Sequence, residues 1–258
     1  MNNPIYYFEI KVLYAYVELY INDLLVFAHY EDNGSIWVDW PINQYILKSG
    51  NQSFEIRIIP YKNNTNFSDN TLLEFGIHVL DESINDRKEI LEKSEININQ
   101  KSKTPLFIHK NSFNAEVPYE NLGWTNSIDL SKENKDQLLV EILKWNSELL
   151  NIYRTSDISL YNKLYKDRDY EFSKAYYKTY QEGTKDIFHS KFKNLDLINN
   201  DLYELKFYGN NKLVSVKLPK ELPGFTFEPT LKDEDSLGIS LLTFFHRKKE
   251  GDPLEIIR

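Results

Sequence analysis

The hydrophobic period of this chain changes close to Ser131. Before that residue, apolar and polar side chains alternate in short runs, as in residues 54–58, which is the pattern of a strand with one buried face. From about Gln137 to Phe192, apolar side chains recur every three or four residues, as helices require. Strand-like runs then return for the rest of the chain. The change of period predicts two structural units that meet near residue 130.

The first unit, residues 1–130, has the sequence features of a β-sandwich. Asn22 and Asp23 separate two apolar runs, and because both residue types tolerate positive φ, they predict a tight hairpin. One helical turn is expected within residues 41–47, and a short surface helix or a loop in the charged segment 81–103. Further strands are expected at residues 35–40, 54–59, 73–80, 113–117 and 124–130.

The run from Trp40 to Ile56 resembles a connection found in many carbohydrate-binding-like and jelly-roll sandwiches. It leads from a strand through a short turn and a Gly-Asn pair into a core strand. The resemblance covers this run only, and it implies a sandwich architecture rather than sugar binding. Trp37, Trp40 and Trp124 form either an aromatic platform for a sugar or part of the core, and we expect the core because strand alternation turns some of them inward.

The second unit, residues 131–258, is predicted to pack helices on an antiparallel sheet, so that the whole chain is an α+β protein of two domains. Ser131 is the expected N-cap of a first helix. A second helix is expected to begin at Thr155-Ser156-Asp157, to run on through Tyr180 and to stop at Gly183, with a short third helix after it.

Strands are expected in the remainder of the second unit. A hairpin with its turn at residues 209–211 is the clearest, and the apolar run 239–246 is expected in the centre of the sheet. The order of elements in residues 134–258 resembles the nuclear-transport-factor-2-like (SnoaL-like) cone, in which helices back a curved sheet. That family contains isomerases, hydrolases and non-catalytic binders, so the resemblance implies a fold and leaves the activity open.

Composition excludes several classes of protein and site. The chain has no cysteine, which rules out disulfides, thiolate nucleophiles and cysteine-ligated zinc. Its net charge of −8 argues against nucleic-acid binding, which needs a basic surface. The sequence has neither a signal peptide nor an apolar run long enough to cross a membrane, so we expect a cytoplasmic protein without membrane association. The many Asn, Lys and Ile residues suggest a bacterial source.

No catalytic or metal-binding motif stands out, and the sequence has no P-loop, dinucleotide-binding loop or GxSxG motif. The five histidines have no HxH or HxxxH spacing, so only long-range folding could assemble a zinc site, and we expect neither a metal nor a cofactor. The mixed charges of residues 167–171 are expected on a solvated helix face. The basic run from His246 to Lys249 is expected in a salt-bridged turn.

Two functions remain open. The first is protein binding without catalysis, because an acidic chain with many tyrosines and no catalytic motif is similar, as a class, to bacterial immunity proteins that neutralise a basic toxin by surface complementarity. The expected interface consists of Asp233, Glu234, Asp235, Tyr176, Tyr177 and Tyr180. The alternative is a cone-fold enzyme or small-molecule binder with a pocket in the C-terminal domain. Its expected lining is Phe207, Phe227 and Phe244, although we expect these rings to fill a core.

Overall fold

The computed structural model describes the chain except for residues 33, 82, 99–104 and 231–236. The described residues form fifteen strands in four antiparallel sheets, together with two α-helices and short 3-10 turns. The expected mixture of helices and antiparallel sheets is therefore confirmed. By their contacts, the residues divide into two compact units, Met1–Asn121 with Lys174–Lys178 and Leu122–Ser173 with Thr179–Arg258. Whether these units are independent domains stays a prediction.

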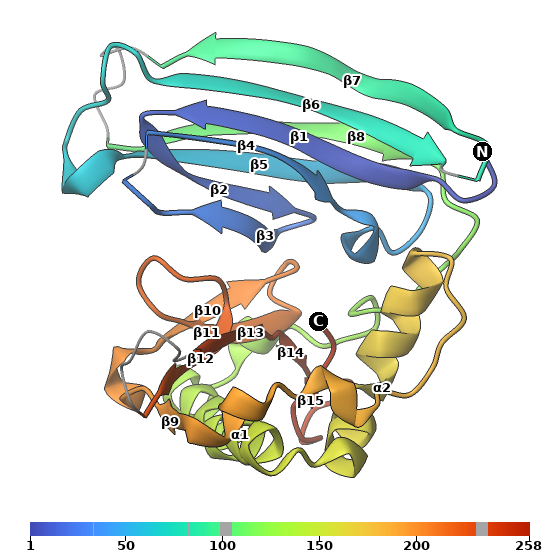
Figure 1. Ribbon diagram of the computed structural model, residues 1–258, viewed down its shortest axis with the longest axis vertical. Helices are drawn as coiled ribbons and strands as arrows, with labels where there is room; N and C mark the ends of the chain where they lie inside the picture. Colours follow the sequence, from blue (N-terminus) through green and yellow to red (C-terminus); the bar gives the residue numbers. More distant parts are fainter. Residues whose placement is uncertain (33, 82, 99–104, 231–236) are drawn as a thin grey trace. The chain divides into compact units, whose positions relative to one another are not determined.

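The first unit is a β-sandwich of two four-stranded sheets that face one another (Figure 1). One sheet has the order β4-β1-β6-β7 and the other β3-β2-β5-β8. Phe8 of the first sheet contacts Phe54 of the second with 5.0 Å between ring centroids, so the core lies between them. The bounds are β1 (Ile5–Leu13), β2 (Ala15–Ile21), β3 (Leu24–His29), β4 (Ser35–Pro41), β5 (Gly50–Pro60), β6 (Leu72–Asp81), β7 (Asp86–Asn97) and β8 (Phe107–Ala115).

The β2–β3 hairpin forms where the sequence predicts it. Asn22 and Asp23 have φ values of 49° and 66°, in the left-handed region that Asn and Asp tolerate. The Asn22 side chain also donates to Gln52 Oε1 at 2.8 Å and accepts from the Ser53 backbone N–H at 3.0 Å. The expected helical turn is the 3-10 turn η1 (Asn43–Tyr45).

Two predictions in this part of the sequence are wrong. The described residues of the charged segment 81–103 hold neither a helix nor only a loop, because β7 runs through Asp86–Asn97 and pairs with β6. Most β7 residues are exposed, since the strand lies at a sheet edge, and this exposure accounts for its many charged side chains. Residues 124–130 do not form a strand, because 124–126 lie in a turn, 127–129 have no regular secondary structure and Leu130 begins the 3-10 turn η3 (Leu130–Lys132).

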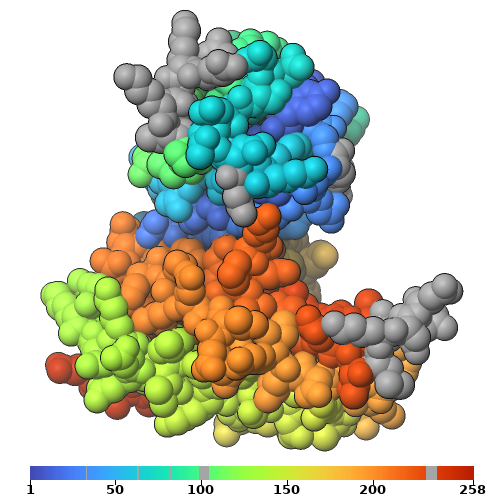
Figure 2. Space-filling view, turned by 90° about the vertical axis from the view of Figure 1, so that its left-hand side faces the viewer, coloured from blue at the N-terminus to red at the C-terminus, as the bar shows by residue number. Residues whose placement is uncertain are grey.

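The second unit packs α1 (Lys135–Thr155) and α2 (Ile158–Ala175) with two sheets of orders β10-β11-β14-β15 and β13-β12-β9. Buried residues of α1 such as Leu138 and Ile142 share a core with Val214 and Val216 of β11. Part of α1, yellow-green in Figure 2, is visible on the surface of this unit. The strand bounds are β9 (Leu195–Leu197), β10 (Glu204–Tyr208), β11 (Leu213–Lys217), β12 (Gly224–Pro229), β13 (Ile239–Leu242), β14 (Phe245–His246) and β15 (Glu255–Ile256).

The helix ends differ from several predictions. The N-cap of α1 is Asn134, whose side chain accepts from the Gln137 backbone N–H at 3.0 Å, whereas Ser131 lies within η3. Asp157 caps α2 as expected, by accepting from the Leu160 N–H at 3.0 Å. Helix α2 ends at Ala175 instead of Gly183. The expected third helix consists of the 3-10 turns η4 (Lys185–Ile187) and η5 (Ser190–Asn194).

The strands of this unit confirm the predicted hairpin at residues 209–211, but the predicted central strand at residues 239–246 is wrong. Strands β10 and β11 pair on either side of the predicted turn at residues 209–211. The run 239–246 does not form one central strand, because it divides into β13, at the edge of one sheet, and β14, inside the other. Among the described residues, no helix has the length and apolar content needed to span a bilayer.

Candidate functional site

A cluster of two carboxylates and one imidazole lies on the outward face of sheet β4-β1-β6-β7. Strand alternation turns Phe8 and Ile10 into the sandwich core and therefore turns Glu9 outward. Asp39 of β4 is the direct partner of Glu9, and His78 of β6 is the partner of Tyr7, which places it diagonally opposite Glu9. One potential ligand atom of each residue lies within 4.8 Å of the other two. We call Glu9, Asp39 and His78 the Glu9 cluster.

Only one oxygen of Glu9 is occupied. The indole Nε1 of Trp37 donates to Oε1 at 3.3 Å, and the Lys93 ammonium donates to the same oxygen. Oε2 accepts no hydrogen bond from any described residue. Gly76 makes the Lys93 contact possible, because a Cβ at this position would lie 3.2 Å from Lys93 Cγ, where the side chain crosses β6.

In the described part of the chain, the other two members of the cluster form no hydrogen bond and no ion pair. His78 is 3% exposed, its ring stacks on Tyr7 with 5.3 Å between centroids, and its Nδ1 is buried without a hydrogen bond. The Asp39 carboxylate is exposed and forms neither a hydrogen bond nor an ion pair with a described residue. The cluster therefore holds polar atoms whose bonding capacity is unused.

Burial and charge set the protonation states of Glu9 and His78. Burial alone would raise the pKa of the Glu9 carboxyl, but the Lys93 ammonium and the Trp37 indole hold that pKa below its ordinary value. Burial and the nearby Arg87 lower the pKa of His78, against the opposite effect of Asp39, Glu89 and Glu9. An ionised carboxylate and a neutral imidazole are the forms in which these groups bind metal ions.

The sequence reasoning missed the Glu9 cluster. Its members come from three strands and are separated by tens of residues, so their proximity depends on the register of two strand pairs. The only local signal is Glu9 itself, a charged residue within the strongly apolar strand β1. That signal indicates an outward position but does not identify the neighbours of Glu9.

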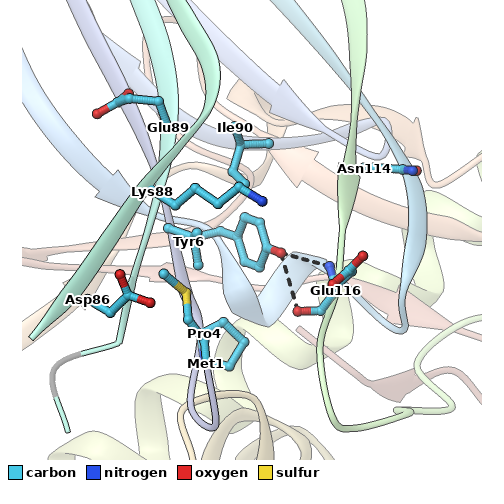
Figure 3. Close-up of a pocket in the computed structure, with 10 residues that line it drawn as sticks. Met1, Pro4, Tyr6, Asp86, Lys88, Glu89, Ile90, Asn114 and Glu116 are labelled. Atoms are coloured by element: carbon cyan, nitrogen blue, oxygen red, sulfur yellow. Dashed lines mark hydrogen bonds between the residues drawn. The ribbon is translucent and has the colours of Figure 1, made fainter. Parts of the chain in front are cut away.

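A pocket of about 450 Å³ is a second candidate site in the first unit (Figure 3). Tyr6 lies at its base, where its hydroxyl accepts from the Glu116 N–H at 2.7 Å and donates to the Glu116 carbonyl at 3.2 Å. In Figure 3 the carboxylate of Glu89 points away from the ammonium of Lys88, which forms no ion pair with a described residue. The remaining lining residues are Met1, Pro4, Val79, Asp86, Ile90 and Asn114.

The structure describes only some of the residues of the predicted interface. Asp233, Glu234 and Asp235 lie outside the described residues. Tyr176, Tyr177 and Tyr180 are half-buried rather than freely exposed. Tyr177 donates to the Pro4 carbonyl at 3.0 Å, and burial raises the pKa of Tyr176 and Tyr177 above the ordinary value. The assignment of these residues to an interface stays a prediction.

The aromatic residues expected to line a C-terminal pocket lie in or against the core. Phe227 and Phe244 are fully buried, and Phe244 contacts Tyr208 edge-on at 5.0 Å between centroids. Phe207 is partly buried against the same core. Of the three tryptophans considered as a platform, Trp124 is buried at 6% exposure, as expected, whereas Trp37 is 69% exposed.

Ser127 and His246 form a buried pair that resembles part of a nucleophile-and-base arrangement. Ser127 Oγ lies 2.7 Å from His246 Nδ1, and Glu255 Oε2 lies 4.0 Å from His246 Nε2. Burial lowers the pKa of His246. The Ser127 residue is only 7% exposed, so its hydroxyl is not positioned to meet a substrate, and we assign the pair to the polar part of the core.

The charged runs singled out in the sequence have structural partners. Arg247 pairs with Glu133 at 3.0 Å and with Glu141 at 2.8 Å, so the basic run is salt-bridged as predicted, although these partners lie before and within α1 rather than in the neighbouring turn. Arg168 departs from the predicted solvated face. Its guanidinium stacks over the Tyr165 ring at 3.9 Å and pairs with Asp169 at 2.7 Å.

The chain was also compared with known proteins. No protein-family model, curated protein or solved structure matches it. The resemblances to the SnoaL-like cone and to immunity proteins therefore stay predictions.

Proposed function

We propose that this protein acts without catalysis by binding another protein, and that Trp37 anchors the partner. Trp37 lies on the outward face of the sandwich beside Asp39 and is 69% exposed. Its indole N–H donates to Glu9 Oε1 at 3.3 Å, so the side chain is oriented before any partner arrives. Trp is enriched among the residues that dominate binding energy in protein interfaces, because a held ring loses little conformational freedom on binding.

The partner class that fits best is a basic protein, such as a toxin that this chain neutralises. Asp39 lies beside Trp37 on the same face, and no described residue neutralises it by an ion pair. The chain as a whole carries a net charge of −8, which steers a basic partner toward it. This proposal keeps the immunity function expected from the sequence and moves the proposed contact from the tyrosines after α2 to Trp37.

The test uses the protein as bait in three forms, which are the unchanged chain, Trp37→Ala and Tyr14→Ala. Tyr14 is a matched control because it is also an exposed aromatic residue of the first unit, at 47%. The expected result is a basic partner retained by the unchanged chain and by Tyr14→Ala. Trp37→Ala should weaken the interaction about thirtyfold or more, because the loss of a hot-spot residue costs at least about 2 kcal/mol.

Two outcomes contradict the proposal. Equal retention of the partner by Trp37→Ala and the unchanged chain would exclude Trp37 as the anchor. A toxin function additionally requires that the retained partner stop cell growth when expressed alone and that co-expression of this protein restore growth. A partner that is harmless on its own would contradict the immunity function and leave protein binding in place.

Binding of a small polar molecule is a second candidate function, and the pocket in Figure 3 favours it. Its lining combines the Lys88 ammonium with carboxylates and apolar side chains, which suits a ligand that carries both charges. This candidate can be tested by measuring the melting temperature of the protein in the presence of each member of a library of amino acids and related zwitterions. A ligand whose stabilising effect is lost in Lys88→Met would support it, whereas an effect retained in that variant would place the ligand elsewhere.

A further inference from the structure

We propose that Glu9, Asp39 and His78 form a binding site for one divalent transition-metal ion, with Zn²⁺ as the preferred ion. The three residues come from adjacent strands of one sheet, and their ligand atoms already lie within 4.8 Å of one another. This proposal concerns the Glu9 cluster alone and does not depend on the proposed protein partner.

The first argument is that the ligand atoms are unused. In the described part of the chain, Glu9 Oε2 accepts no hydrogen bond and the Asp39 carboxylate has no partner. His78 is 3% exposed, and its Nδ1 is buried without a hydrogen bond. Buried polar groups in folded proteins are nearly always satisfied, so an imidazole with a buried, unpaired nitrogen close to two carboxylates requires an explanation. A bound cation supplies one, because it accepts electron pairs from all three groups.

The second argument is geometric. Ligands on a tetrahedral Zn²⁺ lie at about 2.0–2.2 Å from the ion and therefore about 3.3 Å from one another. The separations in the Glu9 cluster are at most 4.8 Å. We therefore expect that small side-chain rotations would bring the ligand atoms to the distances that the ion requires. The backbone positions are fixed, since Glu9 and Asp39 are direct partners in the β1–β4 pair. Asp39 is exposed, which gives an ion a route from solvent to the two buried ligands.

The third argument concerns the choice of ion. One imidazole and two carboxylates form a mixed nitrogen and oxygen ligand set, which suits Zn²⁺, whereas Mg²⁺ and Ca²⁺ prefer oxygen ligands alone. Three protein ligands leave a fourth tetrahedral position for water. Metal binding at this site would also join β4, β1 and β6 through their side chains, so it should stabilise the first unit.

Lys93 competes with the metal ion. Its ammonium donates to Glu9 Oε1 and is about half-exposed, so it neutralises Glu9 in the absence of an ion and can turn away into solvent. When Zn²⁺ binds Glu9, the Lys93 ammonium is repelled by the ion. Removal of the Lys93 charge should therefore strengthen metal binding, although Lys93 itself is not a ligand.

The experiment is calorimetric titration of the full-length protein, freed of metal with a chelator, with ZnCl₂, MgCl₂ or CaCl₂. The expected result is one Zn²⁺ per chain, with no comparable binding of Mg²⁺ or Ca²⁺. Asp39→Asn and His78→Gln should each weaken Zn²⁺ binding at least tenfold. Glu74→Gln is the matched control, because Glu74 is a carboxylate of β6 that pairs with Lys11 at 3.1 Å and does not belong to the cluster.

Lys93→Met provides a second and opposite readout. It should bind Zn²⁺ several-fold more tightly than the unchanged chain, a result that a nonspecific surface site would not give. Absence of Zn²⁺ binding, or equal affinity in Asp39→Asn and the unchanged chain, would overturn the proposal, as would weaker binding in Lys93→Met. If His78→Gln fails to fold, Asp39→Asn decides the question alone, because Asp39 is exposed and its replacement leaves the core intact.

Discussion

Asp81 shows how a single side chain can make the stability of this protein depend on pH. Its carboxylate accepts from the backbone N–H groups of Asn2 at 2.6 Å and Asn3 at 2.9 Å, and from the Ser83 hydroxyl at 2.6 Å. These hydrogen bonds lower the pKa of Asp81 from 3.8 to about 2. The bond from the Asn3 N–H has the largest effect, and the bond from the Ser83 hydroxyl has the next largest. Because the folded protein favours the ionised form, this contribution to stability is complete above pH 3.8 and is lost as the pH falls toward about 2.

The pH dependence can be measured with Asp81→Asn. We expect this variant to melt at a lower temperature than the unchanged chain at pH 6, because the charged acceptor is gone. The difference in melting temperature should narrow as the pH falls from 4 to about 2, where Asp81 of the unchanged chain becomes protonated. If the difference in melting temperature between Asp81→Asn and the unchanged chain were the same at pH 2.5 and pH 6, Asp81 would not be the source of the pH dependence.

Glu171 and Arg258 form a buried ion pair in the second unit, at 2.8 Å between Oε2 and NH2. Glu171 also accepts from the Gly123 N–H at 2.8 Å. Replacement of Glu171 by Gln removes this negative charge from beside the buried guanidinium, so we expect the free energy of unfolding to fall by about 3 kcal/mol in urea denaturation. The control is Glu120→Gln, because the exposed Lys48–Glu120 pair at 3.8 Å should contribute less than about 1 kcal/mol. Equal effects of the two substitutions would contradict this expectation.

At the scale of single elements, the β10–β11 turn is held by three consecutive residues with positive φ. Gly209, Asn210 and Asn211 have φ values of 57°, 55° and 64°. Asn211→Val should destabilise the protein by about 1–2 kcal/mol, since a β-branched side chain is strained in the left-handed region. Asn211→Gly should be close to neutral, because glycine adopts this conformation freely. Urea denaturation of both variants tests the claim, which fails if Val and Gly give the same stability at this position.

Elements could be predicted from the sequence where neighbouring residues alone determine the local structure. Both hairpin turns were predicted correctly because residue pairs such as Asn22 and Asp23 select the turn without help from the rest of the chain. Strand β7 was missed because an exposed edge strand buries too few side chains to show a clear apolar alternation. The end of α2 at Ala175 was missed because the apolar period continues into tyrosines that leave the helix.

The Glu9 cluster could not be predicted from the sequence, for a different reason. Each of its three residues is unremarkable in its own strand, and only the registers of β1 with β4 and with β6 bring them together. A shift of either pair by one residue would turn one member to the opposite face of the sheet. Local propensity and spacing do not determine that register, so neither the cluster nor its unused ligand atoms could be derived from the sequence.

At the scale of the whole molecule, the first unit is not one continuous piece of chain. Residues Lys174–Lys178 belong to it although they follow α2. The fully buried Asn43 connects them to the sandwich, since its amide donates to the Ala175 carbonyl at 3.0 Å and to the Pro4 carbonyl at 2.9 Å, while its Oδ1 accepts from the Tyr6 N–H at 2.7 Å. Tyr177 adds a hydrogen bond to the Pro4 carbonyl at 3.0 Å.

A fragment of residues 1–130, which is the N-terminal domain expected from the sequence, should therefore be less stable than the same residues in the full chain. Without Ala175 and Tyr177, the Asn43 amide and the Pro4 carbonyl keep their hydrogen bond to one another but each lose a second partner, and the loss of one such hydrogen bond costs about 0.5–1.5 kcal/mol. Hydrogen exchange should be faster in residues 4–8 and 42–46 of the fragment than in the full chain, while strands distant from these contacts, such as β3, should differ less.

Tyr177→Phe in the full chain separates this effect from general instability of a truncated protein. It removes only the hydroxyl that donates to Pro4, so it should cost about 1 kcal/mol in urea denaturation and leave exchange at residues 42–46 nearly unchanged. If the fragment exchanged as slowly as the full chain at both segments, the contribution of residues 174–178 would be negligible and residues 1–130 would be a complete folding unit. If exchange increases only near Pro4 and Asn43, the first unit depends on residues 174–178, which follow residues 122–173 of the second unit in the sequence, and a boundary at residue 130 does not separate two independent domains.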